Sequence, residues 1–597
     1  MEASVSSIKG LIQSGRLLRI PYFQRSYVWG EDDWDRFATD MESTLNDSQD
    51  YFLGAVILKE EQKLDNDAIN GIEQRCMVVD GQQRLTTLCI YMKVLHSLSL
   101  EDAKFKYQYL RDNDTQEPVI EHSREDRAMF VEVMHKEVIH TVPNPQESNI
   151  IKAYNYFAER LLQRRDEREY LRNLISTINA RIRFVVITLT TTDDEQQIFD
   201  TINSLGVPLT TCDLVKNFLY GPDDEQAYNE NWRAVFESTK EARDFWATDA
   251  SKSRQEKTKD NSTIERFFHA FVRIKMWDFK DQLTEAQKKS FVKMSNIFST
   301  CKAFVEKFGI DKQDLANEII EYAELFKNNL GAEVLDDDNI PMYGCIERIS
   351  CFINATKQYS VIPYVLYILH EVGDEAERNK IFTYLETYLV RRILVESNNK
   401  SYSEFFAESL IGNKIKTAQD LRNFIDNKAA DANLAMPNNA KLKLDISTRN
   451  KGLGDVLAQT ILYLYETKLS DNLVRKSYNE FYVQTLMPKP KATNANSWPQ
   501  HRRDTAMEKE RVMLLGTLGN YFMLNSAGQK ALKKKADEAC ATKVDEMRKW
   551  YDESIVRSNH ILFDRGSNRS ISEWNENTIK LRNKGLVEIF CNHIWTL

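Results

Sequence analysis

The sequence lacks the features that mark secreted, membrane-spanning and zinc-binding proteins. Its 597 residues include eight scattered cysteines and no Cys-x-x-Cys pair, which argues against a disulfide framework or a zinc site and indicates reduced thiols. No apolar run approaches the roughly 18 residues of a membrane-spanning helix. The N-terminus has no basic region followed by an apolar core, as a signal peptide would. We therefore expect a cytoplasmic chain that does not enter a membrane.

The chain also lacks a strong excess of charge of either sign. Its formal net charge is −9 and 28% of its residues are charged, which keeps it soluble and argues against a histone-like DNA wrapper. A local basic groove stays compatible with this balance. The length of 597 residues is too great for one hydrophobic core, so we expect about two to four domains.

The first third of the chain combines strand and helix patterns. One run of β-branched residues ends at Asp80, and after Arg84 the apolar residues recur at helical spacing, so a strand is expected to turn into a helix there. The predicted strands are 51–58, 76–79 and 182–189, and further helices are expected at 193–206 and from Thr210 or Thr211 onward.

Helical patterns dominate the remainder. They run from about residue 264 to 480 and are interrupted by a polar loop at 426–445. Near the C-terminus, 512–525 resembles a short strand region, and two helical stretches follow. The expected fold class is therefore an α+β N-terminal domain, a mostly α-helical middle and a small C-terminal region, mainly α overall.

A dense polar cluster occupies the predicted strand-to-helix turn in "VVDGQQRLTTL". The start of a helix favours a bound anion, and Gly81 allows a ligand to approach the backbone. Arg84 suits bidentate phosphate contact, Asp80 could hold Mg²⁺ or orient a water, and Gln82 and Gln83 can position a water. Phosphoryl transfer needs mainly positioning and charge neutralisation. The alternative is a local Asp80–Arg84 ion pair, with the glutamines capping the helix.

Two further segments carry candidate site residues. "RIPYFQRSYVW" contains Gln24 and Arg25, which could supply another phosphate or base contact, in an aromatic setting expected to lie mostly in the core. The alternative is an N-terminal strand. In "IFDTINSLGVPLTTCDLVKNFL", Asn203 near the predicted helix end either points into the site or caps the helix.

Together these segments resemble a known family. "IPYFQRSYVW", "YFLGAVIL", "VVDGQQRLTTL" and "IFDTINSLGVPLTTCDLVKNFL" occur in the order seen in the GmrSD and SspE-like proteins of bacterial DNA restriction. The resemblance implies an N-terminal domain similar to ParB and sulfiredoxin, whose DGQQR motif is associated with nucleotide hydrolysis. It also implies a helical middle and a C-terminal domain resembling an HNH nuclease. The expected domains are 1–225, 226–476 and 477–597.

The C-terminal resemblance includes "GTLGNYFMLN" and "WNENTIKLRNKGLVEIFCNHIW", but its nuclease motif is incomplete. The family's nuclease strand usually carries His-x-x-Pro, often as "EHIMP", whereas this chain has "QTLMP", with Thr485 at the histidine position. That histidine is the general base of an HNH site, and threonine cannot replace it at neutral pH. Asn520 and Asn525 keep the frame of the motif. We therefore expect a degenerate, ββα-like nuclease domain, with His501 as the candidate substitute base.

Basic residues surround this C-terminal region. They would neutralise DNA phosphates or belong to a solvated helix face, since Asp537 and Glu538 follow them directly. The resemblance favours DNA contact. These residues are Lys489, Lys491, Arg502, Arg503, Lys530, Lys533, Lys534 and Lys535.

Three functions are consistent with these residues. The first is an NTP-hydrolysing, DNA-sensing subunit of an anti-phage restriction system, with Mg²⁺ at Asp80, that gates a nuclease in this chain or in a partner. The second is a non-enzymatic switch that binds nucleotide or modified DNA. The third is a scaffold that has lost both activities, which the intact Asp80–Arg84 run disfavours. Expected partners are DNA, including modified phage DNA, a second subunit with an active nuclease, and a further copy of the chain.

Overall fold

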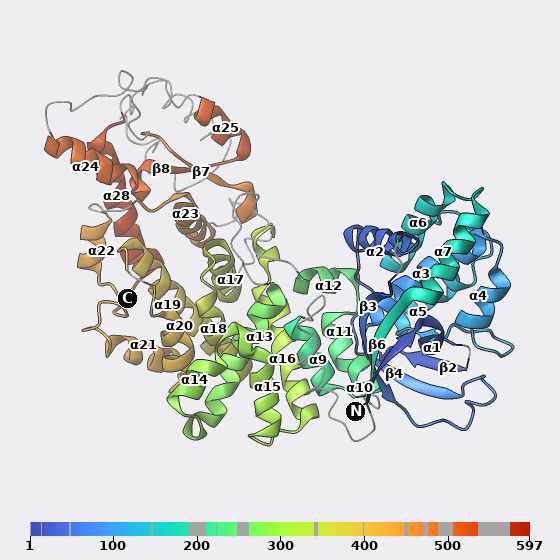
Figure 1. The fold of residues 1–597 in the computed structure, drawn as a ribbon. Helices are drawn as coiled ribbons and strands as arrows, with labels where there is room; N and C mark the ends of the chain where they lie inside the picture. Colours follow the sequence, from blue (N-terminus) through green and yellow to red (C-terminus); the bar gives the residue numbers. More distant parts are fainter. Residues whose placement is uncertain are drawn as a thin grey trace. The chain divides into compact units, whose positions relative to one another are not determined.

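The computed structural model forms two compact units, residues Met1–Ala234 and Val235–Leu597 (Figure 1). The finer division at residue 476 expected from the sequence stays a prediction. The structure describes residues 2–13, 15–46, 49–144, 147–189, 210–221, 224–247, 262–338, 344–397, 399–446, 452–469, 476–487, 505–534 and 574–597.

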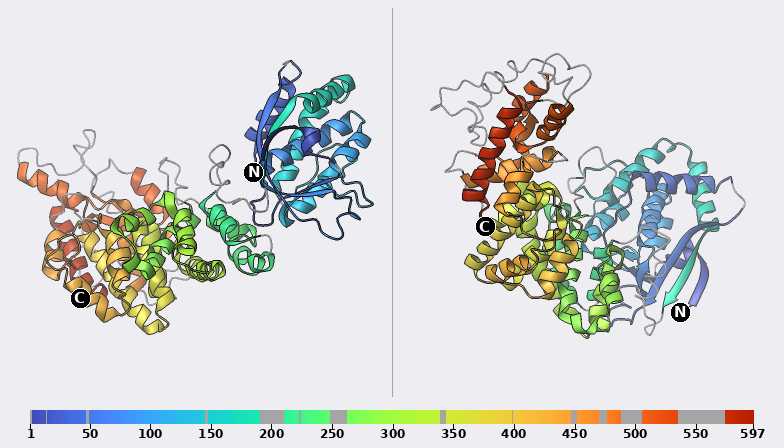
Figure 2. Two further views of the ribbon diagram at one scale, coloured as in Figure 1. Left: turned by 60° about the horizontal axis from the view of Figure 1, so that its bottom comes forward. Right: turned by 90° about the vertical axis from the view of Figure 1, so that its left-hand side faces the viewer.

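A six-stranded mixed sheet with the order β1-β6-β3-β4-β2-β5 forms one layer of the first unit, and helices pack against it (Figure 2). β4 runs antiparallel to β3 and parallel to β2, and β3 runs parallel to β6. The three strands predicted from sequence are β3, β4 and β6. The strands are β1 (Glu2–Ser7), β2 (Arg16–Arg19), β3 (Tyr51–Glu60), β4 (Gln74–Asp80), β5 (Ile120–Glu121) and β6 (Ile182–Leu189).

Helices cover one face of this sheet. In β6 the residues Ile182, Phe184 and Val186 alternate into the core, as expected for a strand with one buried face. Nearly the whole surface of α3 is buried, because α4, α5, α6 and α7 pack around it. The helices are α1 (Ile8–Leu11), α2 (Glu31–Ser43), α3 (Gln82–Leu98), α4 (Asp102–Tyr109), α5 (Arg124–Met134), α6 (Asn149–Leu162) and α7 (Arg168–Arg181).

The first unit ends in short helices after the sheet. Thr210 caps α9 (Thr211–Leu219) by accepting a hydrogen bond from the Asp213 backbone N–H, as one of the two predicted caps. Tyr22 joins this region to the sheet, since its hydroxyl donates to the Gly221 carbonyl and its ring packs on Tyr228. The elements that follow are α10 (Glu225–Ala227), a π-helical turn (Tyr228–Trp232) and α11 (Arg233–Phe236). The helix predicted at 193–206 lies outside the described residues.

The second unit is mostly helical, which confirms the predicted fold class. Phe267, Phe268 and Phe271 on α13 form part of its buried aromatic core. The predicted loop at 426–445 ends in a short helix, α22. The helices are α12 (Lys240–Ala247), α13 (Thr263–Lys275), α14 (Glu285–Phe291), α15 (Ile297–Glu306), α16 (Lys312–Leu330), α17 (Cys345–Thr356), α18 (Ile362–Glu371), α19 (Glu375–Leu394), α20 (Tyr402–Glu404), α21 (Ala418–Asp426), α22 (Asn439–Asp445) and α23 (Asp455–Leu469).

The end of the chain contains a two-stranded antiparallel sheet followed by a helix. β7 (Tyr482–Thr485) pairs with β8 (Tyr521–Leu524), and α25 (Ser526–Lys534) follows. The strand-like stretch 512–525 was only partly predicted correctly, because its first residues complete α24 (Thr505–Leu515). The last long helix is α28 (Glu576–Ile589). No helix in the described part of the chain is long and apolar enough to span a membrane.

Candidate functional site

The predicted strand-to-helix turn is present where β4 ends at Asp80 and α3 begins at Gln82. Gly81 between them is the N-cap of α3 and has φ of +99°, a conformation that side-chain-bearing residues rarely adopt. A Cβ at Gly81 would also lie 3.0 Å from Val56 Cγ2 on the neighbouring β3. Glycine is therefore required to begin the helix this close to the sheet, with its first backbone N–H groups at the strand's end.

Asp80 and Arg84 form the ion pair foreseen as the structural alternative. Arg84 Nη2 donates to Asp80 Oδ2 at 3.0 Å, and the side chains are 21% and 30% exposed, respectively. Among the described residues, Arg84 makes no other hydrogen bond, so most of the N–H groups of its fork are available to a ligand. An ion pair and a phosphate site are compatible, because a partly exposed arginine can contact a carboxylate and a phosphate together.

Gly54 on β3 makes room for this guanidinium. Its φ is +119°, and a Cβ built on it would lie 2.1 Å from Arg84 Nη1. A side chain at position 54 would therefore move the guanidinium away from Asp80. The close approach of Arg84 to the β3 backbone depends on this glycine.

We expect Gly54→Ala to displace Arg84 and to lower any activity that uses it. The positive φ adds a cost of about 1–2 kcal/mol to the free energy of unfolding. Thermal denaturation and ligand titration would measure the two effects. Gly373→Ala is the control, because its Cβ would meet open space and little change is expected. An unchanged affinity for anions in Gly54→Ala would show that the Arg84 position is unimportant.

The two glutamines of the motif hydrogen-bond to backbone groups within residues 24–28, the polar segment that precedes α2. Gln82 Nε2 donates to the Arg25 carbonyl at 3.0 Å, and Gln83 Nε2 donates to the Ser26 carbonyl at 3.2 Å. Gln83 Oε1 also accepts from the Val28 backbone N–H at 2.9 Å. Gln83 therefore uses both ends of its amide on the backbone of 26–28, and its first role is to fasten this segment to the start of α3.

Gln24 fixes the same segment to the end of β4. Its Nε2 donates to the Val78 and Val79 carbonyls at 2.8 and 3.0 Å, while its Oε1 is buried without a hydrogen-bond partner among the described residues. A buried acceptor in this condition is costly unless a ligand or water donates to it. Gln24 is thus placed beside the turn, as predicted, with one polar atom still to be satisfied.

Tyr27 anchors the far end of the segment in the core. Its hydroxyl lies 2.6 Å from Thr87 Oγ1 and accepts from Trp34 Nε1 at 2.8 Å, and its backbone N–H donates to Asp126 Oδ2 at 2.6 Å. The aromatics Phe23 and Tyr27 are buried, as expected from sequence, although the segment is a loop and not a strand.

A buried histidine lies beside this network and is too enclosed and too weakly basic to serve as a general base. His122 Nε2 lies 3.0 Å from the Thr86 hydroxyl. Complete burial lowers the pKa of His122 to about 3, so the ring is neutral at physiological pH. Its role is to pack and to hydrogen-bond within the core.

Arg25 lies close to a second carboxylate of the site, that of Asp213. Burial lowers the pKa of Arg25, whereas the negative charges of Asp213 and Asp80 oppose that shift, which places its guanidinium in the field of both. Asp213 is the N3 residue of α9, and its Oδ1 lies 3.7 Å from the buried Lys216 Nζ. Asp80, Asp213, Arg25, Arg84 and Lys216 thus combine three cations with two carboxylates, a balance that suits an anionic ligand.

Asp213 and Lys216 were not among the residues predicted for the site. Their segment was recognised only as a capped helix, because Thr210 and Asp213 form a capping box. Contact with the polar segment is direct, since the Asn217 side-chain amide donates to the Phe23 carbonyl at 2.8 Å. The available signal was the spacing of Asp213, Lys216 and Asn217 on one side of a short helix.

Asp80 and Asp213 suit a metal ion only if a bound ligand supplies further oxygen atoms. Among the described residues, no group of three or more His, Cys, Asp or Glu side chains could hold a metal ion. Asp80 would offer one carboxylate, which is the usual protein contribution to Mg²⁺ when substrate phosphates supply further oxygens. The residues present therefore fit Mg²⁺ carried by a polyphosphate.

The predicted nuclease residues Thr485, Asn520 and Asn525 all make contacts that hold the local fold together. Asn520 is fully buried, and its amide donates to the Met487 and Leu515 carbonyls and accepts from the Met487 N–H and Trp574 Nε1. Asn525 Oδ1 accepts from the Gly528 N–H at the start of α25. Thr485 pairs with Tyr521 across the small sheet.

Part of the predicted basic flank lies in the described chain. Lys530, Lys533 and Lys534 are exposed on α25, while Leu532 is buried, so these lysines are accessible to a polyanion. The other candidates lie outside the described residues. These are Asn203, Lys489, Lys491, His501, Arg502, Arg503 and Lys535.

Comparison with known families identifies the first unit. Residues 8–220 match the family model of the GmrSD restriction endonuclease, N-terminal domain. The match covers strands β2 to β6, the β4–α3 turn and α9, whereas β1 precedes it. No curated protein matches the chain. The N-terminal part of the chain is therefore similar to the N-terminal domain of GmrSD restriction endonucleases.

Proposed function

We propose that the chain is an NTP-hydrolysing, DNA-sensing subunit of a bacterial modification-dependent restriction system that acts against phage DNA. Nucleotide turnover in the first unit would gate a nuclease, and a second subunit would carry the active nuclease site. The observation that carries the proposal is the partly exposed Arg84–Asp80 pair at the start of α3, with Arg25 and Asp213 alongside. The GmrSD-type domain supports a role in restriction.

The chain's own residues would act mainly by placing and neutralising phosphate groups. The backbone N–H groups at the start of α3 and the dipole of this helix favour the phosphate. Arg84 presents its remaining N–H donors, and Arg25 and Lys216 add positive charge to the same place. Developing negative charge in the transition state is stabilised most by donors fixed in advance, and the Gln83 and Gln24 contacts fix the segment that carries Arg25.

Asp80 would have two roles at this site. Its carboxylate orients Arg84 through the 3.0 Å ion pair, and it is the residue that would hold Mg²⁺ bound with the nucleotide. When bound, Mg²⁺ would neutralise negative charge on the phosphates. Asp80 or Asp213 would hold the attacking water, because Gln83 uses both ends of its amide, and Gln82 its Nε2, on the backbone of 25–28.

A non-enzymatic switch is the second candidate function. The engagement of Gln82 and Gln83 with the backbone favours it, since these side chains are then less able to order a water. Nucleotide binding would shift the segment 24–28 through the same hydrogen bonds. In this case the chain would bind NTP and change its assembly with a partner or with a second copy, without turnover.

Steady-state phosphate release from the purified full chain separates the two functions. Each of ATP, GTP, CTP and UTP would be assayed with Mg²⁺, with and without DNA carrying modified bases. Multiple turnovers with at least one nucleotide are expected. Saturable nucleotide binding without phosphate release would identify the switch instead, and absence of both would contradict both candidate functions.

A further inference from the structure

A basic pocket of about 580 Å³ lies in the second unit, apart from the proposed nucleotide site. Its walls come from α19, α21, the end of α23 and the last residues of the chain. Segments far apart in sequence therefore meet there, because His593 and Leu597 line the same space as Lys380 and Arg422. The volume is in the range of small-molecule sites, about 300–1,000 Å³.

The charged side chains that line this pocket are basic. Lys380, Arg422 and Lys468 contribute to its wall together with His593, and no Asp or Glu side chain lines it among the described residues. Arg422 has no ion-pair partner in the described chain and lies with its guanidinium carbon 5.1 Å from the centre of the Tyr384 ring. Lys380 is paired with Glu377 at 3.2 Å, and Arg422 and Lys468 supply further positive charge to the lining.

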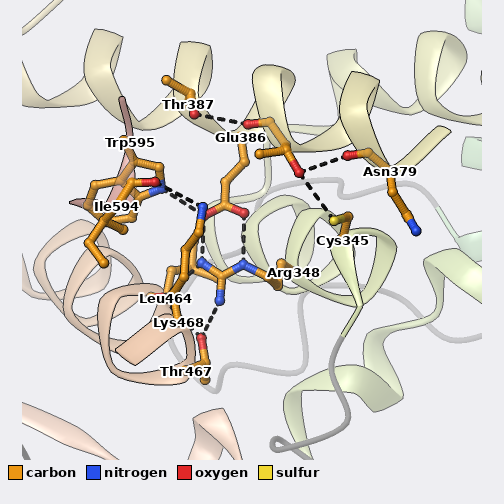
Figure 3. Close-up of polar contacts among 11 residues, drawn as sticks. Cys345, Arg348, Asn379, Glu386, Thr387, Leu464, Thr467, Lys468, Ile594 and Trp595 are labelled. Atoms are coloured by element: carbon orange, nitrogen blue, oxygen red, sulfur yellow. Dashed lines mark hydrogen bonds and ion pairs between the residues drawn. The ribbon is translucent and has the colours of Figure 1, made fainter. Parts of the chain in front are cut away.

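One cation of the pocket wall, Lys468, lies beside a buried charge pair that is already balanced. Glu386 is buried, accepts from Arg348 Nε and Nη2 at 2.8 and 2.6 Å, and also accepts from Trp595 Nε1 at 2.7 Å (Figure 3). Arg348 already neutralises this carboxylate in a bidentate pair. Lys468 lies alongside as an extra positive charge.

Within the described part of the chain, the hydrogen-bond partner of Lys468 is neutral. Its Nζ donates to the Ile594 carbonyl at 2.9 Å (Figure 3). Although the side chain reaches solvent through the pocket, the surrounding protein desolvates the ammonium and lowers the pKa of Lys468, while Glu386 opposes that shift. An anion in the pocket would supply the counter-charge that Lys468 lacks.

The remaining lining suits a ligand with a polar and an apolar part. Asn379, Thr383 and Gln419 offer amide and hydroxyl groups, and Ile594 and the Tyr384 ring offer apolar surface. Compact clusters of arginine and lysine are typical of phosphate recognition. Duplex DNA needs a run of basic residues that follows its backbone, whereas these cations converge on one cavity.

We propose that the pocket between α19, α21 and the C-terminal residues binds a small phosphorylated anion of mononucleotide size. Lys380, Arg422 and Lys468 contact the phosphate, and the Tyr384 and Ile594 side contacts the less polar part. The site differs from the one at Asp80 and Arg84 and does not depend on NTP hydrolysis. It gives the helical unit a ligand of its own.

Calorimetric titration of the full chain tests the proposal. Pyrophosphate and ADP are the probes, and Arg84→Ala supplies a background in which the proposed nucleotide site is weakened. We expect the Arg84→Ala chain to keep one binding site for ADP. Adding Lys380→Gln and Arg422→Gln should weaken that site by about tenfold or more, since each removes a charge-assisted contact.

Matched controls make the result specific to the pocket. Lys380 and Arg422 are exposed, so their replacement leaves the fold intact, as circular dichroism would verify. Lys289→Gln removes an exposed lysine elsewhere on the second unit and should leave the affinity unchanged. Pyrophosphate binding without ADP binding would identify a free polyphosphate as the ligand.

Three results would overturn the proposal. The first is equal affinity in the Arg84→Ala chain with and without the two pocket substitutions. The second is no binding of either probe below about 1 mM, which is the weak end of measurable affinity. The third is citrate binding as tightly as pyrophosphate, which would show a site for any anion.

Discussion

Arg84→Ala and Asp80→Ala should each reduce NTP hydrolysis by about a thousandfold or more. Loss of an arginine that stabilises transferred phosphate typically costs about 10³ to 10⁵ in rate. In this protein Arg84 is the residue at the start of α3 with available donors, and Asp80 orients it. Phosphate release under saturating nucleotide and Mg²⁺ is the measurement.

The fold should survive both substitutions. The pair is partly exposed, and such pairs contribute about 1 kcal/mol or less to the free energy of unfolding. Thermal denaturation would therefore shift little. The control is Lys136→Ala, which removes another i,i+4 ion pair, that with Glu132 on α5, and should keep full activity. Wild-type turnover in either Arg84→Ala or Asp80→Ala would show that the motif is structural only.

The second large effect is an absence of DNA cleavage by the purified chain. A general base contributes about 10² to 10⁴ in rate, and Thr485 stands where the HNH histidine is expected. In the structure Thr485 lies in the short β7–β8 sheet, and Asn520 is fully used in holding this sheet to the residues around it. The chain alone, with Mg²⁺ or Mn²⁺, should therefore neither nick nor cut plasmid DNA.

Comparison of the wild type with His501→Ala tests the remaining candidate base. His501 lies outside the described residues, so its role rests on the sequence alone. Cleavage by the wild type that disappears in His501→Ala would show that this histidine replaces the missing one and that no catalytic partner is needed. Cleavage that persists in the variant would place the nuclease centre elsewhere in the chain. No cleavage by the wild type supports a separate nuclease subunit.

The exposed lysines of α25 would then serve in DNA contact without cutting. Lys530, Lys533 and Lys534 face solvent, while Leu532 on the same helix is buried.

The last long helix, α28, packs against the turn before β8. Its Asn583 Oδ1 accepts a hydrogen bond from the Gly519 N–H at 2.6 Å. The two C-terminal segments that carried the family resemblance are therefore joined in one small core.

Local pattern alone determined the organisation of the chain. The change from strand to helical spacing around Asp80 placed the turn correctly, and Gly81 has the positive φ that such a turn requires. The cap of α9 at Thr210 and the helical second unit were also predictable. These features depend on residues within one or two turns of each other, so backbone preference and periodicity are sufficient to determine them.

Only the tertiary structure decided which side chains meet. Arg84 lies over Gly54 because β3 pairs with β4. Asp213 lies close enough to Arg25 to affect its pKa because α9 contacts the Phe23 carbonyl nearby. Sequence reasoning assigned the glutamines to water, and the structure adds that Gln82 Nε2 and both ends of the Gln83 amide bind backbone groups tens of residues away. Strand order and helix packing set such contacts, and neither is encoded in local spacing.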